Sequence, residues 1–240
     1  MINDKKILSV IPARGESKGI KLKNLRKVNG KELVCKAIEV SLQVQEIDHT
    51  VVSTDHDDIA EAAIKEGIDV PFRRPDSLSG DRVSDYEVLL HALHESERIY
   101  SKTFDIILML QPTSPLRTVS NIKDAISMLV ESSFDSVWSV TETDSKAHPL
   151  KQFSVSDNND LSYYDIKGKE IIARQQLNPV YHRNGVVYAI SRSCLVHHGD
   201  IFGERCGALV LKGDNHISID TEWDLKLVNL IQSEEFNQSV

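Results

Sequence analysis

Short apolar runs alternate with amphipathic segments along this 240-residue chain. Apolar runs of strand length predict strands at residues 7–11, 50–53, 70–72, 104–110, 136–140, 185–190, 208–211 and 217–219. Between them, apolar residues recur at helical spacing, which predicts helices at residues 32–43, 57–65, 86–98, 119–131 and 222–232. Repeated strand–helix units imply an α/β fold with a Rossmann-like, mostly parallel sheet and helices on both of its faces.

The alternation breaks between residues 141 and 185, where the chain is polar and rich in turn signals. This stretch predicts a hairpin or small lobe inserted into the sheet. We therefore expect one α/β domain formed by residues 1–140 and 186–240, and a lobe formed by residues 141–185. A chain of 240 residues is long enough for one such domain with an insertion.

Composition and charge narrow the classes of function. Apolar residues make up 40% of the chain and charged residues 27%, an ordinary globular balance. The net charge of −8 argues against nonspecific nucleic-acid binding and against binding to an acidic membrane surface. The apolar runs are far shorter than the roughly 20 residues that cross a bilayer, and the first residues lack the features of a signal peptide. Three scattered cysteines fit a reducing compartment, so we expect a cytoplasmic protein.

The loop after the first predicted strand combines cations with glycines. It begins at Pro12, contains two glycines and carries four cations within ten residues: Arg14, Lys18, Lys21 and Lys23. Glycines let backbone amides turn toward an anion, and a buried strand that delivers such a loop is typical of polyphosphate sites in α/β proteins. The P-loop spacing G-x-x-x-x-G-K-[ST] and the dinucleotide fingerprint G-x-G-x-x-G are both absent. A solvated loop with scattered lysines is the alternative, and the strand-then-loop context favours a phosphate site.

Two further loops carry polar side chains where a predicted strand ends. Residues 73–84 add cations and small hydroxyl groups, and residues 111–117, Q-P-T-S-P-L-R, offer donors suited to a carboxylate, a sugar or a phosphate. A rigid turn whose Ser and Thr cap the next helix is the alternative for residues 111–117. Since ligands of parallel sheets bind beyond the carboxyl ends of the strands, we expect these loops to converge on one crevice.

Asp220 lies where the last predicted strand gives way to a helix. A carboxylate at this position can hold Mg²⁺ against phosphate oxygens, because Mg²⁺ takes one or two protein ligands and several waters. The alternative is a helix cap, in which Asp220 or Thr221 accepts a hydrogen bond at the start of the helix that begins near Glu222. A phosphate loop elsewhere in the chain supports the metal hypothesis.

The motifs of these loops follow one another in a recognisable order. They read I-P-A-R-G-E-S-K-G-I-x-L-K-N, S-T-D, R-R-P-D-S-L-S-x-D, Q-P-T-S-P-L-R, H-P-L-K, R-Q-Q-L, R-N-G-V-V-Y and S-I-D-T-E-W-D-L. In this order, from Ile7 to Leu225, the chain resembles the acylneuraminate (CMP-sialic acid) cytidylyltransferases. The resemblance implies that CTP and a 2-keto sugar acid of the nine-carbon N-acylneuraminate type give a CMP-sugar and pyrophosphate, with Mg²⁺ or, in its place, Mn²⁺.

The resemblance also implies roles for individual residues. Arg14, Lys18 and Lys23 are expected to clamp the phosphates, and Asp220 is expected to bind the metal ion. The expected contacts to the nucleotide or the sugar are Asn24, Arg74 and Asp81 (the last two beside the cytidine), Gln111 and Arg117 on the sugar side, and Tyr188, for which an ordinary core tyrosine is the alternative. Lys151 and Arg174 match cations that family members use on the sugar acid, in some cases from a partner subunit. Residues 141–185 then resemble the dimerisation lobe of the family, so we expect a homodimer.

The chain departs from the family pattern at two positions. Where members commonly show D-I-D, this chain has Ser218, and a serine hydroxyl binds a hard cation far more weakly than a carboxylate does. Either Asp220 suffices together with water and phosphates, or His216 or Asp214 compensates, or the affinity for metal is lower. Gly80 stands where members often carry serine, which matters less because backbone amides can still bind the base.

Other functions stay open on the sequence alone. A cytidylyltransferase for legionaminic, pseudaminic or octulosonic acid fits the same motifs, since sugar selectivity rests on side chains that the motifs do not place. A sugar-1-phosphate nucleotidylyltransferase is disfavoured by the missing G-x-G-T-R-L opening. A non-catalytic nucleotide- or sugar-binding relative with a decayed metal site is supported by Ser218 alone. The sequence does not identify the general base.

Overall fold

The computed structural model describes residues 4–213 and 216–233. A six-stranded sheet forms its centre, with the strand order β10-β6-β9-β5-β1-β4. In chain order these strands are β1 (Ile7–Pro12), β4 (His49–Ser53), β5 (Ile106–Met109), β6 (Ser136–Glu142), β9 (Tyr181–Ser191) and β10 (Cys206–Val210). β1 runs parallel to β4 and β5, and β6 runs parallel to β10, whereas β9 is antiparallel to both of its neighbours. The sheet is therefore mostly parallel, as the sequence predicts.

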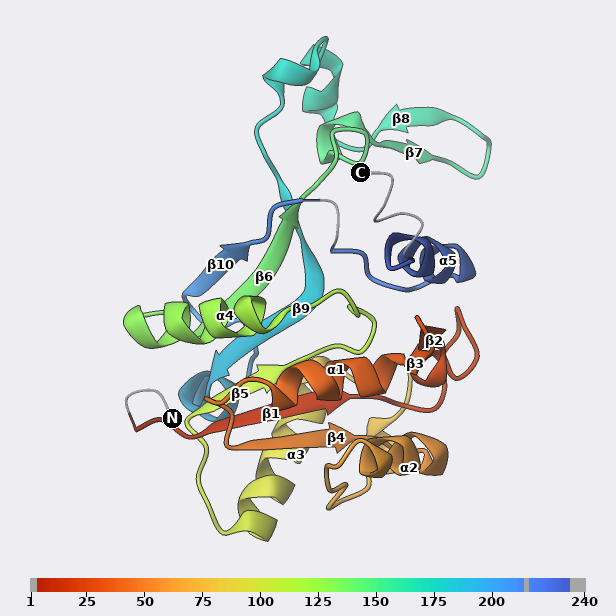
Figure 1. Ribbon diagram of the computed structural model, residues 1–240. Helices are drawn as coiled ribbons and strands as arrows, with labels where there is room; N and C mark the ends of the chain where they lie inside the picture. Colours follow the sequence, from red (N-terminus) through yellow and green to blue (C-terminus); the bar gives the residue numbers. More distant parts are fainter. Residues whose placement is uncertain (1–3, 214–215, 234–240) are drawn as a thin grey trace.

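Helices cover both faces of this sheet (Figure 1). They are α1 (Leu33–Leu42), α2 (Asp57–Lys65), α3 (Asp85–Tyr100) and α4 (Val119–Glu131). A fifth helix, α5 (Glu222–Ile231), lies beside the sheet and packs on Ile20, Val28 and Leu33. Because successive strand residues point to opposite faces, Ile7 and Ile11 of β1 pack with α1, α2 and α4, while Leu8 and Val10 pack with α3. All four side chains are fully buried. This two-sided burial confirms the predicted α/β fold class.

Two of the predicted strands do not form, at residues 70–72 and 217–219. Both are three-residue stretches with apolar end residues, and these residues are apolar because the loop is packed against a helix. Phe72 is 8% exposed and joins the apolar cluster under α3, while Pro71 has no backbone N–H to give to a ladder. Ile219 is fully buried against α5, and its N–H donates to the carbonyl of Thr113 (2.8 Å). Burial in a loop therefore mimics the pattern of a short strand.

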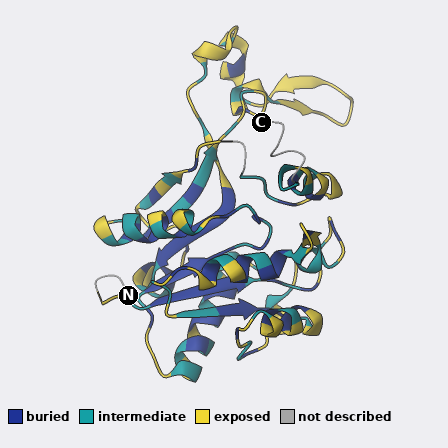
Figure 2. Ribbon diagram, viewed as in Figure 1, coloured by how far each residue is buried: buried dark blue, intermediate teal, exposed yellow. Residues whose placement is uncertain are grey.

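The inserted segment stands away from the sheet on the extended strands β6 and β9, which stay paired as far as Glu142 and Tyr181 (Figure 1). It contains the predicted hairpin, β7 (Phe153–Val155) and β8 (Leu161–Tyr163), together with short helical turns. A second small hairpin, β2 (Lys27–Val28) and β3 (Lys31–Glu32), precedes α1. The expected boundaries at residues 140/141 and 185/186 cut across the β6–β9 pair and stay a prediction. Figure 2 shows that most of the lobe is exposed.

The topology brings several loops to one edge of the sheet. β1, β4 and β5 all end at this edge, and β9, being antiparallel to β5, enters the sheet from it. Loops that follow parallel strands at their carboxyl ends form the usual ligand crevice of such folds. Within residues 4–213 and 216–233, no helix is both long and apolar enough to span a bilayer.

Candidate functional site

A cavity of about 570 Å³, here called the main cavity, opens at this edge of the sheet. The loops after β1, β4 and β5, the first half of β9 and the segment before α5 all contribute to its wall. Eight of the twelve residues predicted from the sequence line it: Arg14, Lys23, Asn24, Arg74, Asp81, Gln111, Tyr188 and Asp220. Segments up to about 200 residues apart in the chain therefore meet at one surface, as the loop positions predict.

The glycines of the first loop serve close packing. The N–H of Gly15 donates to Asp55 Oδ1 (2.8 Å), and a Cβ on Gly15 would lie 2.5 Å from the His56 ring. A Cβ on Gly19 would lie 2.4 Å from the carbonyl oxygen of Asp220. Both values are far below a normal contact, so a side chain at position 19 would collide with backbone and one at position 15 would displace the His56 ring. The cationic loop is thereby pressed against the segments that carry Asp55 and Asp220.

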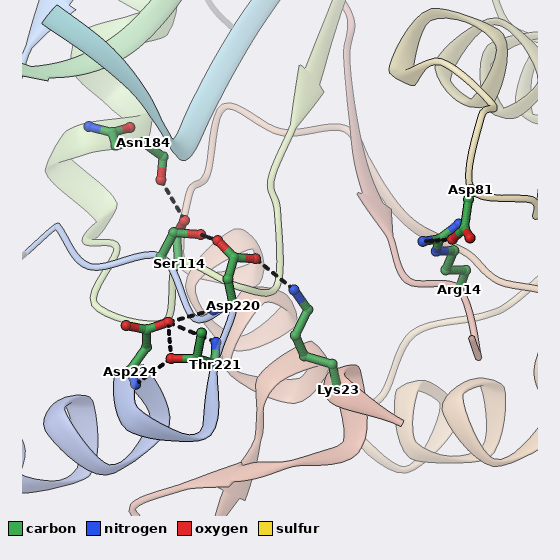
Figure 3. Close-up of polar contacts among 9 residues, drawn as sticks. Arg14, Lys23, Asp81, Ser114, Asn184, Asp220, Thr221 and Asp224 are labelled. Atoms are coloured by element: carbon green, nitrogen blue, oxygen red, sulfur yellow. Dashed lines mark hydrogen bonds and ion pairs between the residues drawn. The ribbon is translucent and has the colours of Figure 1, made fainter. Parts of the chain in front are cut away.

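Three of the four cations of this loop are paired with two carboxylates from distant segments. Arg14 Nη2 lies 2.7 Å from Asp81 Oδ1, and Lys18 Nζ lies 2.6 Å from Asp81 Oδ2. Lys23 Nζ lies 2.9 Å from Asp220 Oδ1 (Figure 3). We call these five residues the phosphate end of the site. The hydrogen bond from Lys18, and then the one from Arg14, lowers the pKa of the Asp81 carboxyl group below its usual value. Asp81 thus contacts the cations expected to hold phosphate.

Lys18 faces a second hollow, here called the side cavity. Its volume is about 620 Å³, and its lining includes Lys18, Lys21, His56 and Asp81. Lys18 does not line the main cavity, whereas Asp81 lines both. The Asp81 side chain therefore lies at the boundary between the two cavities.

Asp220 does not cap α5. The cap is Thr221, whose hydroxyl accepts from the Asp224 N–H (3.2 Å), while Asp224 accepts from the N–H of Thr221 (2.7 Å) and of Asp220 (3.0 Å). This reciprocal capping box, drawn in Figure 3, leaves the Asp220 side chain 70% exposed at the cavity. Thr221 and Asp224 therefore cap the helix, and the Asp220 carboxylate is free to face a ligand in the cavity.

The donors around Asp220 suit a metal ion that takes most of its ligands from elsewhere. Ser218 also lines the main cavity, with its hydroxyl 3.5 Å from Asp220 Oδ2. Over residues 4–213 and 216–233, no group of three or more His, Cys, Asp or Glu side chains is placed to hold a metal. His216 is not among the lining residues, and Asp214 lies outside the described residues. One carboxylate is what Mg²⁺ commonly takes from a protein when phosphates and water complete its shell.

Arg74 and Asp85 form the wall next to α3. Arg74 is 5% exposed. Its Nε donates to Ser53 Oγ (3.1 Å), and its guanidinium also donates to the Ser53 carbonyl. Burial lowers the pKa of Arg74 to about 10. It therefore stays charged at neutral pH. Burial raises the pKa of the Asp85 carboxyl group, against the opposing effects of Arg183 and Arg74. The sequence assigns no role to Asp85 or Arg183, although Arg183 opens the motif R-N-G-V-V-Y and Asp85 follows the motif R-R-P-D-S-L-S-x-D by four residues.

Another wall, here called the β9 end, is supported by a buried hydrogen-bond network. Ser114 Oγ donates to the Asn184 carbonyl (2.8 Å; Figure 3), and Asn184 Oδ1 accepts from Ser139 Oγ (2.6 Å). Tyr188 stacks on Trp138 at 4.6 Å between ring centroids and is 1% exposed. Its hydroxyl accepts from the Gly185 N–H (3.2 Å) at the cavity wall, so it is both a core residue and a lining residue.

Arg117 does not line the main cavity, contrary to the role expected from the resemblance. Its guanidinium is buried and donates to the carbonyls of Gln111 (2.6 Å), Gly185 (3.1 Å) and Val186. Burial lowers its pKa to about 9. These bonds join the β5–α4 loop to β9 and leave few donors for a ligand. Nor do Thr113 and Ser114 cap α4, whose cap is Thr118.

Lys151 and Arg174 lie in the lobe, away from the main cavity of their own chain. Lys151 is exposed in a short helical turn, Pro149–Lys151. Arg174 is exposed and lines a separate hollow of about 210 Å³ with Glu142 and His148. The single chain does not bring either cation to the phosphate end. Their contact with a sugar acid therefore stays a prediction.

Comparison with known proteins agrees with this geometry. The model of the cytidylyltransferase family matches residues 8–235. The chain is 32% identical to the CMP-N,N'-diacetyllegionaminic acid synthase of Campylobacter jejuni subsp. jejuni, over 95% of this chain and 95% of that protein. It is 29% identical to the N-acylneuraminate cytidylyltransferase of Escherichia coli O18:K1:H7, over 98% of this chain and 54% of that protein.

A solved structure shows the same fold. The CMP:2-keto-3-deoxy-manno-octonic acid synthetase complexed with CTP superposes with a TM-score of 0.69 at 19% identity. The match covers 96% of this chain and 100% of that chain.

Proposed function

The chain belongs to the cytidylyltransferase family, and we propose that it couples CTP to a nine-carbon 2-keto sugar acid of the N-acylneuraminate type. The products are a CMP-sugar and pyrophosphate. The observation that carries this proposal is the convergence of three cations and Asp220 with Gln111 and Tyr188 around the two cavities. Family membership makes the chain a nucleotidyltransferase.

In the proposed reaction the anomeric hydroxyl of the sugar acid attacks the α-phosphorus of CTP in line. A new P–O bond forms, the bond to pyrophosphate breaks, and the hydroxyl loses its proton. Arg14 and Lys18 neutralise the charge that develops on the pyrophosphate, and Lys23 does so on the α-phosphoryl group. Such catalysis depends on positioning and on charge stabilisation more than on covalent chemistry. The resemblance places Arg74 and Asp81 beside the cytidine, and we propose that role for Arg74.

We further propose Asp220 as the protein ligand of a Mg²⁺ ion, with Mn²⁺ as the alternative. The ion supplies positive charge against the phosphate oxygens when bound. Lys23 already attracts the same carboxylate at 2.9 Å, so Asp220 is held at the phosphate end before any ligand arrives. A serine at position 218 leaves Asp220 as the one carboxylate on this segment facing the cavity, and we expect a weaker metal affinity than two carboxylates would provide.

A homodimer formed through the lobe is also proposed. Six large apolar side chains of the lobe are at least 49% exposed: Phe153, Val155, Leu161, Tyr164, Ile166 and Ile172. Exposed apolar surface of this kind marks interaction sites on soluble domains. In such a dimer, Lys151 and Arg174 are expected to reach the sugar acid bound by the partner subunit.

Two alternatives have a specific observation in their favour. The relative that is 32% identical carries the name of a legionaminic acid synthase, so legionaminic, pseudaminic and octulosonic acids belong in any substrate test. A non-catalytic relative with a decayed metal site is favoured by Ser218, since a hydroxyl stands in for a carboxylate.

The test is pyrophosphate release with CTP and Mg²⁺ in the presence of each candidate sugar acid. We expect release with N-acetylneuraminic acid and with CTP alone among the four ribonucleoside triphosphates. Release with a different sugar acid only would show that the reaction is the proposed one and that the sugar substrate is another. CTP binding without release on any sugar would favour the non-catalytic relative.

A further inference from the structure

Asp81 holds two cations of the phosphate end at once. Its Oδ1 lies 2.7 Å from Arg14 Nη2 and its Oδ2 lies 2.6 Å from Lys18 Nζ, so each carboxylate oxygen accepts from a different cation. The cations belong to the loop after β1, whereas Asp81 precedes α3 by a few residues. Figure 3 shows the Asp81 and Arg14 side chains pointing toward one another. This ion-pair bridge ties the two loops together at the boundary of the main and side cavities.

We propose that Asp81 occupies, in the free chain, the position of a phosphate group. Nucleotide binding is then an exchange of anions, in which a phosphate of the incoming polyphosphate replaces the Asp81 carboxylate on Arg14 and Lys18. Carboxylate and phosphate groups both offer two oxygens to guanidinium and ammonium donors at the same distances. The proposal rests on the proposed function only in requiring that the ligand be a polyphosphate.

The energetics favour exchange over a permanent bridge. The side chains of Asp81 and Lys18 are 39% and 81% exposed, so water screens both ion pairs and little is lost when they break. A polyphosphate carries more negative charge than one carboxylate and forms stronger charge-assisted bonds. The lowered pKa of Asp81 keeps its carboxyl group ionised at neutral pH. Asp81 therefore leaves the cations as an anion that moves into solvent.

The exchange has a structural consequence for the two cavities. Asp81 lines both of them, while Arg14 lines only the main cavity and Lys18 only the side cavity. When the carboxylate moves away, the cationic ends of Arg14 and Lys18 face one continuous space. A polyphosphate chain that starts in the main cavity then extends past Arg14 to reach Lys18.

The test replaces Asp81 with its neutral isostere and measures binding of inorganic pyrophosphate without metal or sugar acid. In Asp81→Asn we expect pyrophosphate to bind about three- to tenfold more tightly at low ionic strength, because the internal competitor is gone. Asp76→Asn is the matched control, since it removes the same charge from the same segment. Asp76 is exposed and makes no side-chain hydrogen bond or ion pair within the described ranges, so its variant should bind within about twofold of the parent.

A double-mutant cycle with Lys18→Ala separates contact from long-range charge. The gain from Asp81→Asn should shrink in the Lys18→Ala background, because one of the two contacts is already absent. An equal gain in both backgrounds would overturn the proposal. Weaker pyrophosphate binding by Asp81→Asn would also overturn it, because the carboxylate would then hold Arg14 and Lys18 in place for the ligand. Asp81→Ser provides a second variant if the amide perturbs folding. Because no turnover is involved, the result stands apart from the substrate test above.

Discussion

The phosphate end and the β9 end of the site hold their polar side chains in opposite ways. At the phosphate end, Lys18 and Asp220 are 81% and 70% exposed, and their partners are single opposite charges. At the β9 end, Ser114, Arg117 and Asn184 are at most 4% exposed, and each bonds to backbone atoms. Exposed ion pairs are weak and exchange readily, whereas buried hydrogen bonds are expensive to break. One end is thus suited to exchanging ligands, and the other to keeping the wall of the site in place.

The largest effect on this comparison is expected from Arg117→Met. The substitution leaves three carbonyl acceptors at the β9 end without their donor, partly offset by removal of a buried charge. We expect the free energy of unfolding to fall by about 2–4 kcal/mol, measured by denaturant titration. Arg26→Met is the control, since Arg26 is an exposed arginine paired with Glu222, and it should cost less than about 1 kcal/mol. Full stability with loss of turnover would instead make Arg117 a ligand contact.

Lys18→Ala should have the reverse profile. Turnover should fall about ten- to hundredfold, because a cation that neutralises the leaving pyrophosphate is missing. The free energy of unfolding should change by less than about 0.5 kcal/mol, since the side chain is 81% exposed. Lys65→Ala, at 77% exposure on α2, controls for loss of an exposed lysine and should leave turnover unchanged. Equal turnover in the two variants would show that Lys18 does not neutralise the leaving pyrophosphate.

The smallest effect is expected from Asp85→Asn, at the wall between the two ends. Burial raises the pKa of Asp85 in the folded chain, so the folded chain binds the proton more strongly than the unfolded chain does. Stability therefore falls as pH rises from the unfolded pKa through the folded pKa, and the penalty is complete above the folded value. The amide should relieve it by less than about 1 kcal/mol at pH 7 and by nothing at pH 3, read from melting curves. A variant that melts lower than the parent at pH 7 would contradict this sign.

The sequence predicts the long elements and misses the features that arise from tertiary packing. Strands such as residues 7–11 are confirmed because burial on both faces selects apolar residues at almost every position of the strand. The runs 70–72 and 217–219 fail because a loop packed under a helix has the same composition. Arg117 was expected at the ligand, since nothing local shows that carbonyls of Gly185 and Val186, almost 70 residues later, surround it.

The candidate site likewise has features that the sequence predicts and features that depend on tertiary packing or assembly. The loops predicted to meet do so, because strand ends in a mostly parallel sheet share one edge. The sequence does not mark Asp85, because its half-buried position at the start of α3 depends on how that helix packs against the sheet. Lys151 and Arg174 lie outside the reach of a single chain, so their role depends on an assembly rather than on local sequence.

The most direct test of the central claim compares Asp220→Asn with Asp224→Ala. The two acids lie four residues apart, one facing the cavity and the other closing the cap of α5. We predict that Asp220→Asn lowers CTP-dependent pyrophosphate release by about a thousandfold at an unchanged melting temperature. Asp224→Ala should lower the melting temperature and keep most of the activity, since it loses the acceptor of a capping box worth about 1 kcal/mol. Full pyrophosphate release by Asp220→Asn would contradict the account, because the exposed carboxylate would then have no part in the chemistry.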